Sequence, residues 1–184
     1  LFPGVGNASA SGVCMVINFN HTIVWARDSQ ASATFLADVL GLPAPKRWGP
    51  FLVVKTDNGT NMDFMDADGE IAPQHYAFLV SETEFDEIFG RVRARSLPYW
   101  ADPAQTQPGE INHHDDGRGF YFEDPDGHLL EVITRPYGSG GLDAEHPNPL
   151  LRRCRLLQNC LNLLRGRQVG LRRDRRPLRP VIRR

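Results

Sequence analysis

The same order of predicted elements occurs twice along this chain. A strand, a helix and three further strands are predicted within residues 19–67, and the same succession is predicted within residues 74–137. A repeated unit of this kind restricts the chain to an α+β fold. The predicted fold therefore consists of two tandem βαβββ units, each with its own sheet.

In the first unit, residues 20–26 are rich in β-branched and aromatic side chains and predict a strand. Asp28 or Ser29 can cap a helix over residues 29–40, which Gly41 ends. Three short strands are expected to follow, over residues 46–48, 51–56 and 61–66.

The second unit begins with a predicted strand over residues 74–80. Ser81 and Glu84 then form a capping box at the start of a helix. Three strands are expected after it, over residues 98–101, 120–124 and 129–135. Residues 102–118 form a long loop rich in Pro, Gly and Asp, and loops of this length often lie over a functional site.

The last two strands form a predicted hairpin around the turn sequence Asp-Pro-Asp-Gly at residues 124–127. The strand after this turn reads Leu-Leu-Glu-Val-Ile and carries Glu131 at its centre. A carboxylate in such a strand is costly to bury without a partner. We therefore expect Glu131 to meet a cation, a metal or strong hydrogen-bond donors.

Strand alternation identifies candidate partners for Glu131. If the bulkier residues of each strand face the helix, then His75, Glu131 and Asp63 lie on the opposite faces of their sheets, and His21 is free to do the same. Two imidazoles with one or two carboxylates suit a divalent ion such as Fe, Mn, Co, Ni or Zn. The pattern therefore predicts a metal site built from four polar residues at matching positions of the two units.

The doubled unit, the histidine near the start of each first strand, and the sequence Asp-Pro-Asp-Gly-x-x-x-Glu together resemble the vicinal oxygen chelate superfamily. That superfamily includes glyoxalase I, extradiol ring-cleaving dioxygenases, fosfomycin-resistance transferases and bleomycin-binding proteins. The resemblance covers about residues 19–137. It implies a curved mixed sheet that forms a cup, with His21, His75 and Glu131 as metal ligands inside it.

The resemblance implies three candidate functions. Extradiol dioxygenases use a His, His and Glu triad, which predicts an Fe(II) dioxygenase acting on an aromatic substrate with vicinal oxygens, with Mn, Zn, Ni or Co as other candidate metals. Glyoxalase I has a fourth ligand, usually Glu, at the position of Asp63, so a glyoxalase-like isomerase or lyase is an alternative. Asp63 could also be a hydrogen-bond acceptor for a ligating histidine, or a solvated acid next to a turn. The third is a non-catalytic drug- or metabolite-binding protein of the bleomycin-resistance type. Several segments look most like small dioxygenases associated with aromatic polyketide tailoring.

Aromatic residues near these strands are candidates for a substrate pocket, with core packing as the alternative. They are Trp48, Trp100 and Tyr121.

Other polar residues receive different predictions. His113 and His114 are adjacent and would point in opposite directions on an extended chain, so they predict no metal pair, although an acid–base role in the loop stays open. His128 is expected to be solvated. Arg118 is expected to form a surface ion pair with the neighbouring Asp115 and Asp116, and pairing with an anionic substrate is the alternative.

Charge divides the chain into two parts. Residues 1–138 hold nine Lys and Arg against nineteen Asp and Glu, whereas residues 139–184 hold twelve Arg against three acids. We expect residues 1–18 to be a disordered leader and residues 138–184 to be an Arg-rich tail that is disordered or non-native. Binding of the tail to nucleic acid or an acidic membrane surface is the alternative.

The remaining expectations concern location and partners. Three cysteines without zinc-type spacing indicate a reduced, cytoplasmic protein, and no apolar run is long enough for a membrane span. The expected partners are a small-molecule substrate and, as the resemblance implies, a second copy in a homodimer. Nucleic-acid binding is not expected outside the basic tail.

Overall fold

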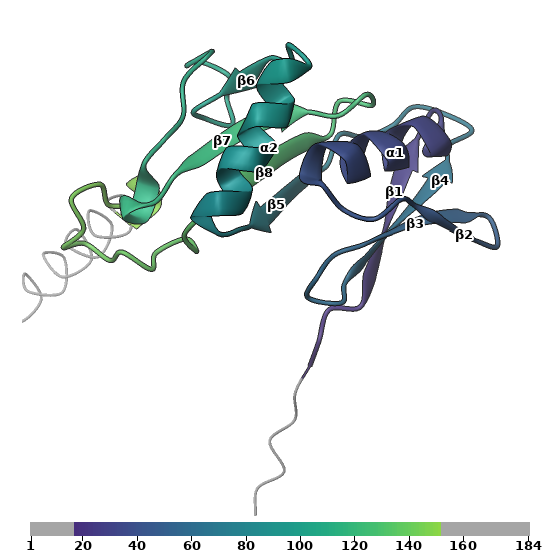
Figure 1. Ribbon diagram of the computed structural model, residues 1–184, viewed down its shortest axis with the longest axis horizontal. Helices are drawn as coiled ribbons and strands as arrows, with labels where there is room; N and C mark the ends of the chain where they lie inside the picture. Colours follow the sequence, from purple (N-terminus) through teal and green to yellow (C-terminus); the bar gives the residue numbers. More distant parts are fainter. Residues whose placement is uncertain (1–16, 152–184) are drawn as a thin grey trace, which may run out of the picture. The chain divides into compact units, whose positions relative to one another are not determined.

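The computed structural model describes residues 17–151 of the chain (Figure 1). The chain divides into two compact units, Leu1–Ala72 and Pro73–Arg184. Most of the predicted leader, and residues 152–184 of the predicted tail, lie outside the described residues. Within residues 17–151, no helix has both the length and the apolar character that a membrane span requires.

The first unit contains one helix and a four-stranded sheet of order β1-β4-β3-β2. Strand β1 pairs with β4 in parallel, and the β2–β3 and β3–β4 pairs are antiparallel. The elements are β1 (His21–Ala26), α1 (Ser29–Leu40), β2 (Lys46–Trp48), β3 (Phe51–Lys55) and β4 (Asn61–Asp66).

Helix α1 forms where the sequence supplies both of its caps. The Asp28 side chain accepts a hydrogen bond from the Ala31 amide at 2.9 Å. Gly41 ends the helix in the left-handed region at φ 77°, which a glycine adopts without strain. Leu36 of the helix and Phe64 of β4 are each only 1% exposed, so the core lies between the helix and one face of the sheet.

The second unit repeats this arrangement with a sheet of order β5-β8-β7-β6. Strand β5 is parallel to β8, and the β8–β7 and β7–β6 pairs are antiparallel. The elements are β5 (His75–Leu79), α2 (Glu82–Ala94), β6 (Tyr99–Trp100), the short 3₁₀ helix η1 (His114–Asp116), β7 (Gly119–Glu123) and β8 (Leu129–Ile133). The predicted α+β fold of two βαβββ units is confirmed.

Helix α2 begins at the predicted capping box, in which Ser81 and Glu84 exchange side-chain and backbone hydrogen bonds. The helix lies across one face of its sheet (Figure 1). Phe85 of the helix packs edge-on against Phe120 of β7, with ring centroids 5.3 Å apart. This aromatic contact anchors α2 to the centre of the sheet.

Arg118 forms an ion pair, but not with the expected aspartates of its own loop. Its guanidinium donates to Glu82 and Asp86 of α2, both at 2.6 Å, and lies over the Phe85 ring. The expected partners were wrong because Asp115 and Asp116 are already occupied by backbone amides that lie later in the sequence.

Residues 136–148, which we call the strap, contain no strand, yet they are held against η1 by Asp115 and Asp116. The buried Asp115 carboxylate accepts from the Gly138 amide at 2.9 Å and from the Gly140 amide at 3.2 Å. Asp116 accepts from the His146 amide at 2.7 Å. The two aspartates therefore replace the missing strand ladder as acceptors for the strap backbone.

The strap approaches η1 so closely that side chains do not fit at one position. A Cβ atom on Gly140 would lie 2.9 Å from the Asp115 Cα atom, which is closer than van der Waals contact allows. Asp115 itself has a left-handed φ of 58°, a region that Asp tolerates better than most residues. The contact between strap and η1 is thus specified by a glycine on one side and an aspartate on the other.

Replacing Asp115 with Ala should release the strap while leaving both sheets folded. The change leaves two strap amides without their charged acceptor and should lower the free energy of unfolding by about 2 kcal/mol or more. Urea denaturation measures this loss, and hydrogen exchange should locate it at the Gly138 and Gly140 amides. Asp143→Ala, at an exposed strap position, is the matched control and should leave both measurements unchanged; equal exchange in the two variants would contradict the prediction.

Candidate metal centre

Glu131 lies at the centre of the second sheet, on the face opposite α2. The register places it between Ala77 of β5 and Tyr121 of β7, so these three residues share one face of the sheet. The Glu131 side chain is only 1% exposed. The predicted burial of a carboxylate within an apolar strand is therefore present, and its partners define the site.

His75 is the first of these partners. It lies two residues before Ala77 on the same face of β5, and its Nε2 atom is 3.2 Å from Glu131 Oε2. Its Nδ1 atom is 3.1 Å from the backbone carbonyl oxygen of Leu129. Both neighbours only accept, so a hydrogen bond to Leu129 requires a proton on Nδ1, and Nε2 then faces the carboxylate either as a second donor or across a bound cation.

This arrangement fits a bound divalent cation. When Nε2 is unprotonated, its lone pair and that of Glu131 Oε2 point at each other across 3.2 Å, which is unfavourable unless a proton or a cation lies between them. Adjacent ligands of an octahedral ion bound at about 2.1 Å lie about 3 Å apart. Metal-binding histidines also commonly donate their other ring N–H to a carbonyl oxygen, as His75 does to Leu129.

The first unit places His21 and Asp63 in the equivalent positions. Ile23 pairs with Asp63 as Ala77 pairs with Glu131, and each histidine lies two residues before the pairing residue. His21 Nδ1 is 2.8 Å from Asn20 Oδ1, which leaves its Nε2 as the acceptor. Asp63 is 5% exposed, and its Oδ1 atom is buried without a hydrogen-bond partner.

An orphaned carboxylate oxygen is an unusual feature of a folded protein, and a bound cation is one way to satisfy it. Within residues 17–151, no three His, Cys, Asp or Glu side chains are already arranged around one point. The structure describes a contact between His75 and Glu131 in the second unit, and His21 and Asp63 at the same register positions in the first. The joint site of His21, His75, Glu131 and Asp63 stays a prediction, and the donor atoms present fit Fe(II), Mn, Co, Ni or Zn.

Tyr137 is a partner of Glu131 that the sequence analysis missed. Its hydroxyl donates to Glu131 Oε1 at 2.5 Å and lies 2.9 Å from the hydroxyl of Tyr121. Burial and the neighbouring Glu131 carboxylate raise the pKa of Tyr137 to about 12. No sequence signal identified this residue, because it follows the last strand at the predicted edge of the domain.

Tyr121, a predicted pocket residue, lies beside the same pair. Its ring stacks on His75 with centroids 6.1 Å apart and an interplanar angle of 29°. Burial, followed by the contacts with Glu131 and Tyr137, raises the pKa of Tyr121 well above its ordinary value. At neutral pH both tyrosines therefore remain hydrogen-bond donors.

The two loop histidines have different surroundings, and His114 begins the 3₁₀ helix η1 rather than lying on an extended chain. The His113 ring is exposed, with Nδ1 3.2 Å from the Gly117 carbonyl oxygen. His114 is half-buried, and this burial lowers its pKa, while the charges of Asp115 and Glu131 oppose the shift. His114 is thus within electrostatic reach of the Glu131 carboxylate.

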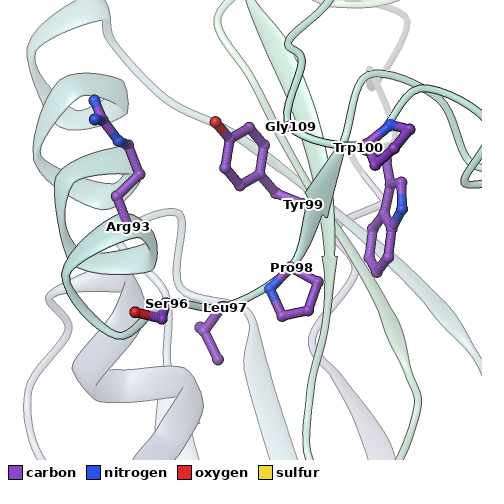
Figure 2. A pocket seen from close by; sticks show the side chains of 8 residues that line it. Arg93, Ser96, Leu97, Pro98, Tyr99, Trp100 and Gly109 are labelled. Atoms are coloured by element: carbon purple, nitrogen blue, oxygen red, sulfur yellow. The ribbon is translucent and has the colours of Figure 1, made fainter.

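Trp48 and Trp100 lie in different units. Trp48 is 70% exposed on β2 and stacks on Phe51. Trp100 pairs with Tyr121 in the sheet and also lines an open hollow beside the end of α2, together with Arg93 and Tyr99 (Figure 2). A role of either tryptophan in substrate binding stays a prediction.

His128 is buried rather than solvated. It is 1% exposed, its Nδ1 atom accepts from the Gln74 amide at 3.0 Å, and its ring meets Tyr76 edge-on. The expectation was wrong because Asp124 folds the turn back by accepting from the His128 amide at 2.8 Å. His128 therefore supports the start of β5, next to His75.

The chain is similar to one protein family and to several characterised proteins. A family model described as the glyoxalase/bleomycin resistance protein/dioxygenase superfamily matches residues 18–132. A curated relative, glutathione transferase FosA from Serratia marcescens, is 31% identical over 125 residues, which is 64% of this chain and 81% of that protein.

Two solved structures are more similar. Oxidase ChaP-H1 is 62% identical, with a TM-score of 0.66, and the match covers 67% of this chain and 99% of that one. Oxidase ChaP-H2 is 61% identical, with a TM-score of 0.68, and the match covers 69% of this chain and all of that one.

Proposed function

Because the chain belongs to the glyoxalase/bleomycin resistance protein/dioxygenase superfamily, we propose that it is an Fe(II)-dependent dioxygenase acting on an aromatic substrate with vicinal oxygens. The observation that carries this proposal is the pair formed by His75 and the buried Glu131. His21 is the third proposed ligand. The identity of 62% to an oxidase supports oxygen chemistry over simple ligand storage.

A bound Fe(II) would supply a Lewis acid with open positions for the substrate oxygens and dioxygen. The chain's own residues prepare its binding. The Leu129 carbonyl oxygen orients the His75 ring, and Glu131 contributes a buried carboxylate next to the exposed imidazole. Ala77, beside Glu131 in the sheet, has only a methyl side chain and leaves space next to the pair.

The same face of the sheet supports the proposed substrate class. The buried Tyr121 ring stacks on the exposed His75 imidazole and supports it on this face of the sheet. Leu79, two residues along β5 from Ala77, is 59% exposed and extends the apolar surface. A polyketide-derived aromatic compound with adjacent oxygens suits this combination of apolar surface and metal ligands.

Metal analysis tests the ligand set directly. The wild-type protein, purified without added metal, should contain about one divalent metal ion per chain, and His75→Ala should lose it because one of three protein ligands is removed. His113→Ala, which removes an exposed loop imidazole, is the control and should retain the metal. Unchanged metal content in His75→Ala would rule out the proposed ligand set.

The unpartnered Oδ1 atom of Asp63 keeps the glyoxalase-like alternative open. The Asp63→Asn variant separates that alternative from the dioxygenase. A three-ligand dioxygenase should keep its metal in this variant and lose no more than about tenfold in metal affinity. Oxygen uptake with a panel of catechols and hydroxyquinones should persist. Loss of the metal in this variant, together with wild-type turnover of a hemithioacetal without oxygen consumption, would favour the isomerase.

We also propose that the active form is a homodimer. The open sheet faces carry exposed apolar side chains, Ile23 at 41% and Trp25 at 45% exposure in the first unit and Leu79 in the second. Sedimentation analysis at micromolar concentration should give twice the chain mass. A monomer that retains oxygen uptake would show that pairing is not required.

A further inference from the structure

We propose that Tyr137 positions Glu131 for metal binding, and that the strap holds Tyr137 in place. The inference rests on the proposed function in that Glu131 is taken as a metal ligand. The phenol is not a ligand in this proposal. It acts on the metal through the carboxylate that it holds.

The two oxygens of Glu131 have different partners. Oε2 faces His75 Nε2 at 3.2 Å, while Oε1 accepts the Tyr137 hydroxyl at 2.5 Å. A carboxylate with one oxygen engaged by a phenol presents the other as a single donor atom. Tyr137 therefore favours binding of a cation through Oε2 alone and restrains rotation of the carboxylate.

The position of Tyr137 depends on the strap rather than on the sheet. Tyr137 lies beyond the end of β8, and its ring is about half exposed, so packing alone does not fix it. The next residue, Gly138, donates its amide to the buried Asp115 at 2.9 Å. Asp115 thus fixes the backbone immediately after Tyr137, and this brings the hydroxyl to Glu131.

The position of this contact in the chain adds a second argument. The family model ends at residue 132, so the strap and Tyr137 lie outside the part of the chain that it matches. Glu131 lies within the matched part. A residue of the strap therefore sets the geometry of a ligand from the common domain, and metal affinity can change without any change to the sheet.

Competition titration of the metal-free full chain with Co(II) and a chelator tests this inference. Tyr137→Phe should lower the affinity for Co(II) by about 10- to 100-fold, the usual effect of removing a hydrogen-bond partner of a ligand. Tyr99→Phe, which removes a phenol on β6 on the side of the α2 core, is the matched control and should bind as the wild type does. Thermal unfolding of the metal-free variants checks that each one folds.

The visible spectrum of the Co(II) protein provides a readout that a general loss of stability would not produce. Without its phenol, Glu131 Oε1 is free to turn towards the metal, and a higher coordination number weakens the absorption bands of Co(II). Tyr137→Phe should therefore show weaker bands at saturating Co(II). Tyr99→Phe should give the wild-type spectrum.

Asp115→Ala tests the role of the strap. It should lower the affinity for Co(II) as Tyr137→Phe does. The double variant should lose no more affinity than the more affected single variant, because both changes remove the same hydrogen bond to Glu131. Wild-type affinity in Tyr137→Phe, or losses that multiply in the double variant, would overturn the inference while the proposed function stands. A wild-type chain that binds no metal would overturn the proposed function and, with it, this inference.

Discussion

The burial of a single carboxylate organises the second unit. Glu131 is 1% exposed within an apolar strand, and an ionised group in that position must be compensated by partners that the fold brings to it. These partners come from different parts of the unit: His75 from the neighbouring parallel strand, Tyr121 from the antiparallel one, and Tyr137 from the strap. Strand pairing and strap docking thus both converge on one functional group.

The first unit has the same strand register, but its buried carboxylate lacks the hydrogen-bond partners that Glu131 has. Asp63 occupies the position of Glu131, yet its side chain is one methylene shorter and its buried Oδ1 atom has no hydrogen-bond partner. The described residues of the first unit include no counterpart of the strap, because that unit's last strand leads towards the start of the second unit. Among the described residues, the histidine and the carboxylate therefore occupy matching positions in both units, whereas the Tyr137 hydroxyl donates to Glu131 and no donor reaches Asp63 Oδ1.

Sequence reasoning succeeded where local rules decide the outcome. Alternation along β5 and β8 placed His75 and Glu131 on one face, and caps at Asp28 and Ser81 marked the starts of both helices. It failed where contacts join segments without a periodic pattern. Tyr137 reaches Glu131 only because Asp115 binds backbone amides more than twenty residues later, and no local signal encodes such a pairing.

Strand pairing and loop hydrogen bonds differ in how easily they can change without disrupting the fold. His75 and Glu131 are placed by a strand ladder, so moving either one by a single residue would turn it to the opposite face of the sheet. The Tyr137 hydroxyl is placed by loop hydrogen bonds that centre on Asp115, which can be lengthened, rotated or lost without disturbing a strand. If Glu131 is a metal ligand, as proposed, changes in the strap would therefore alter how firmly it holds the cation, while the sheet preserves which residues face it.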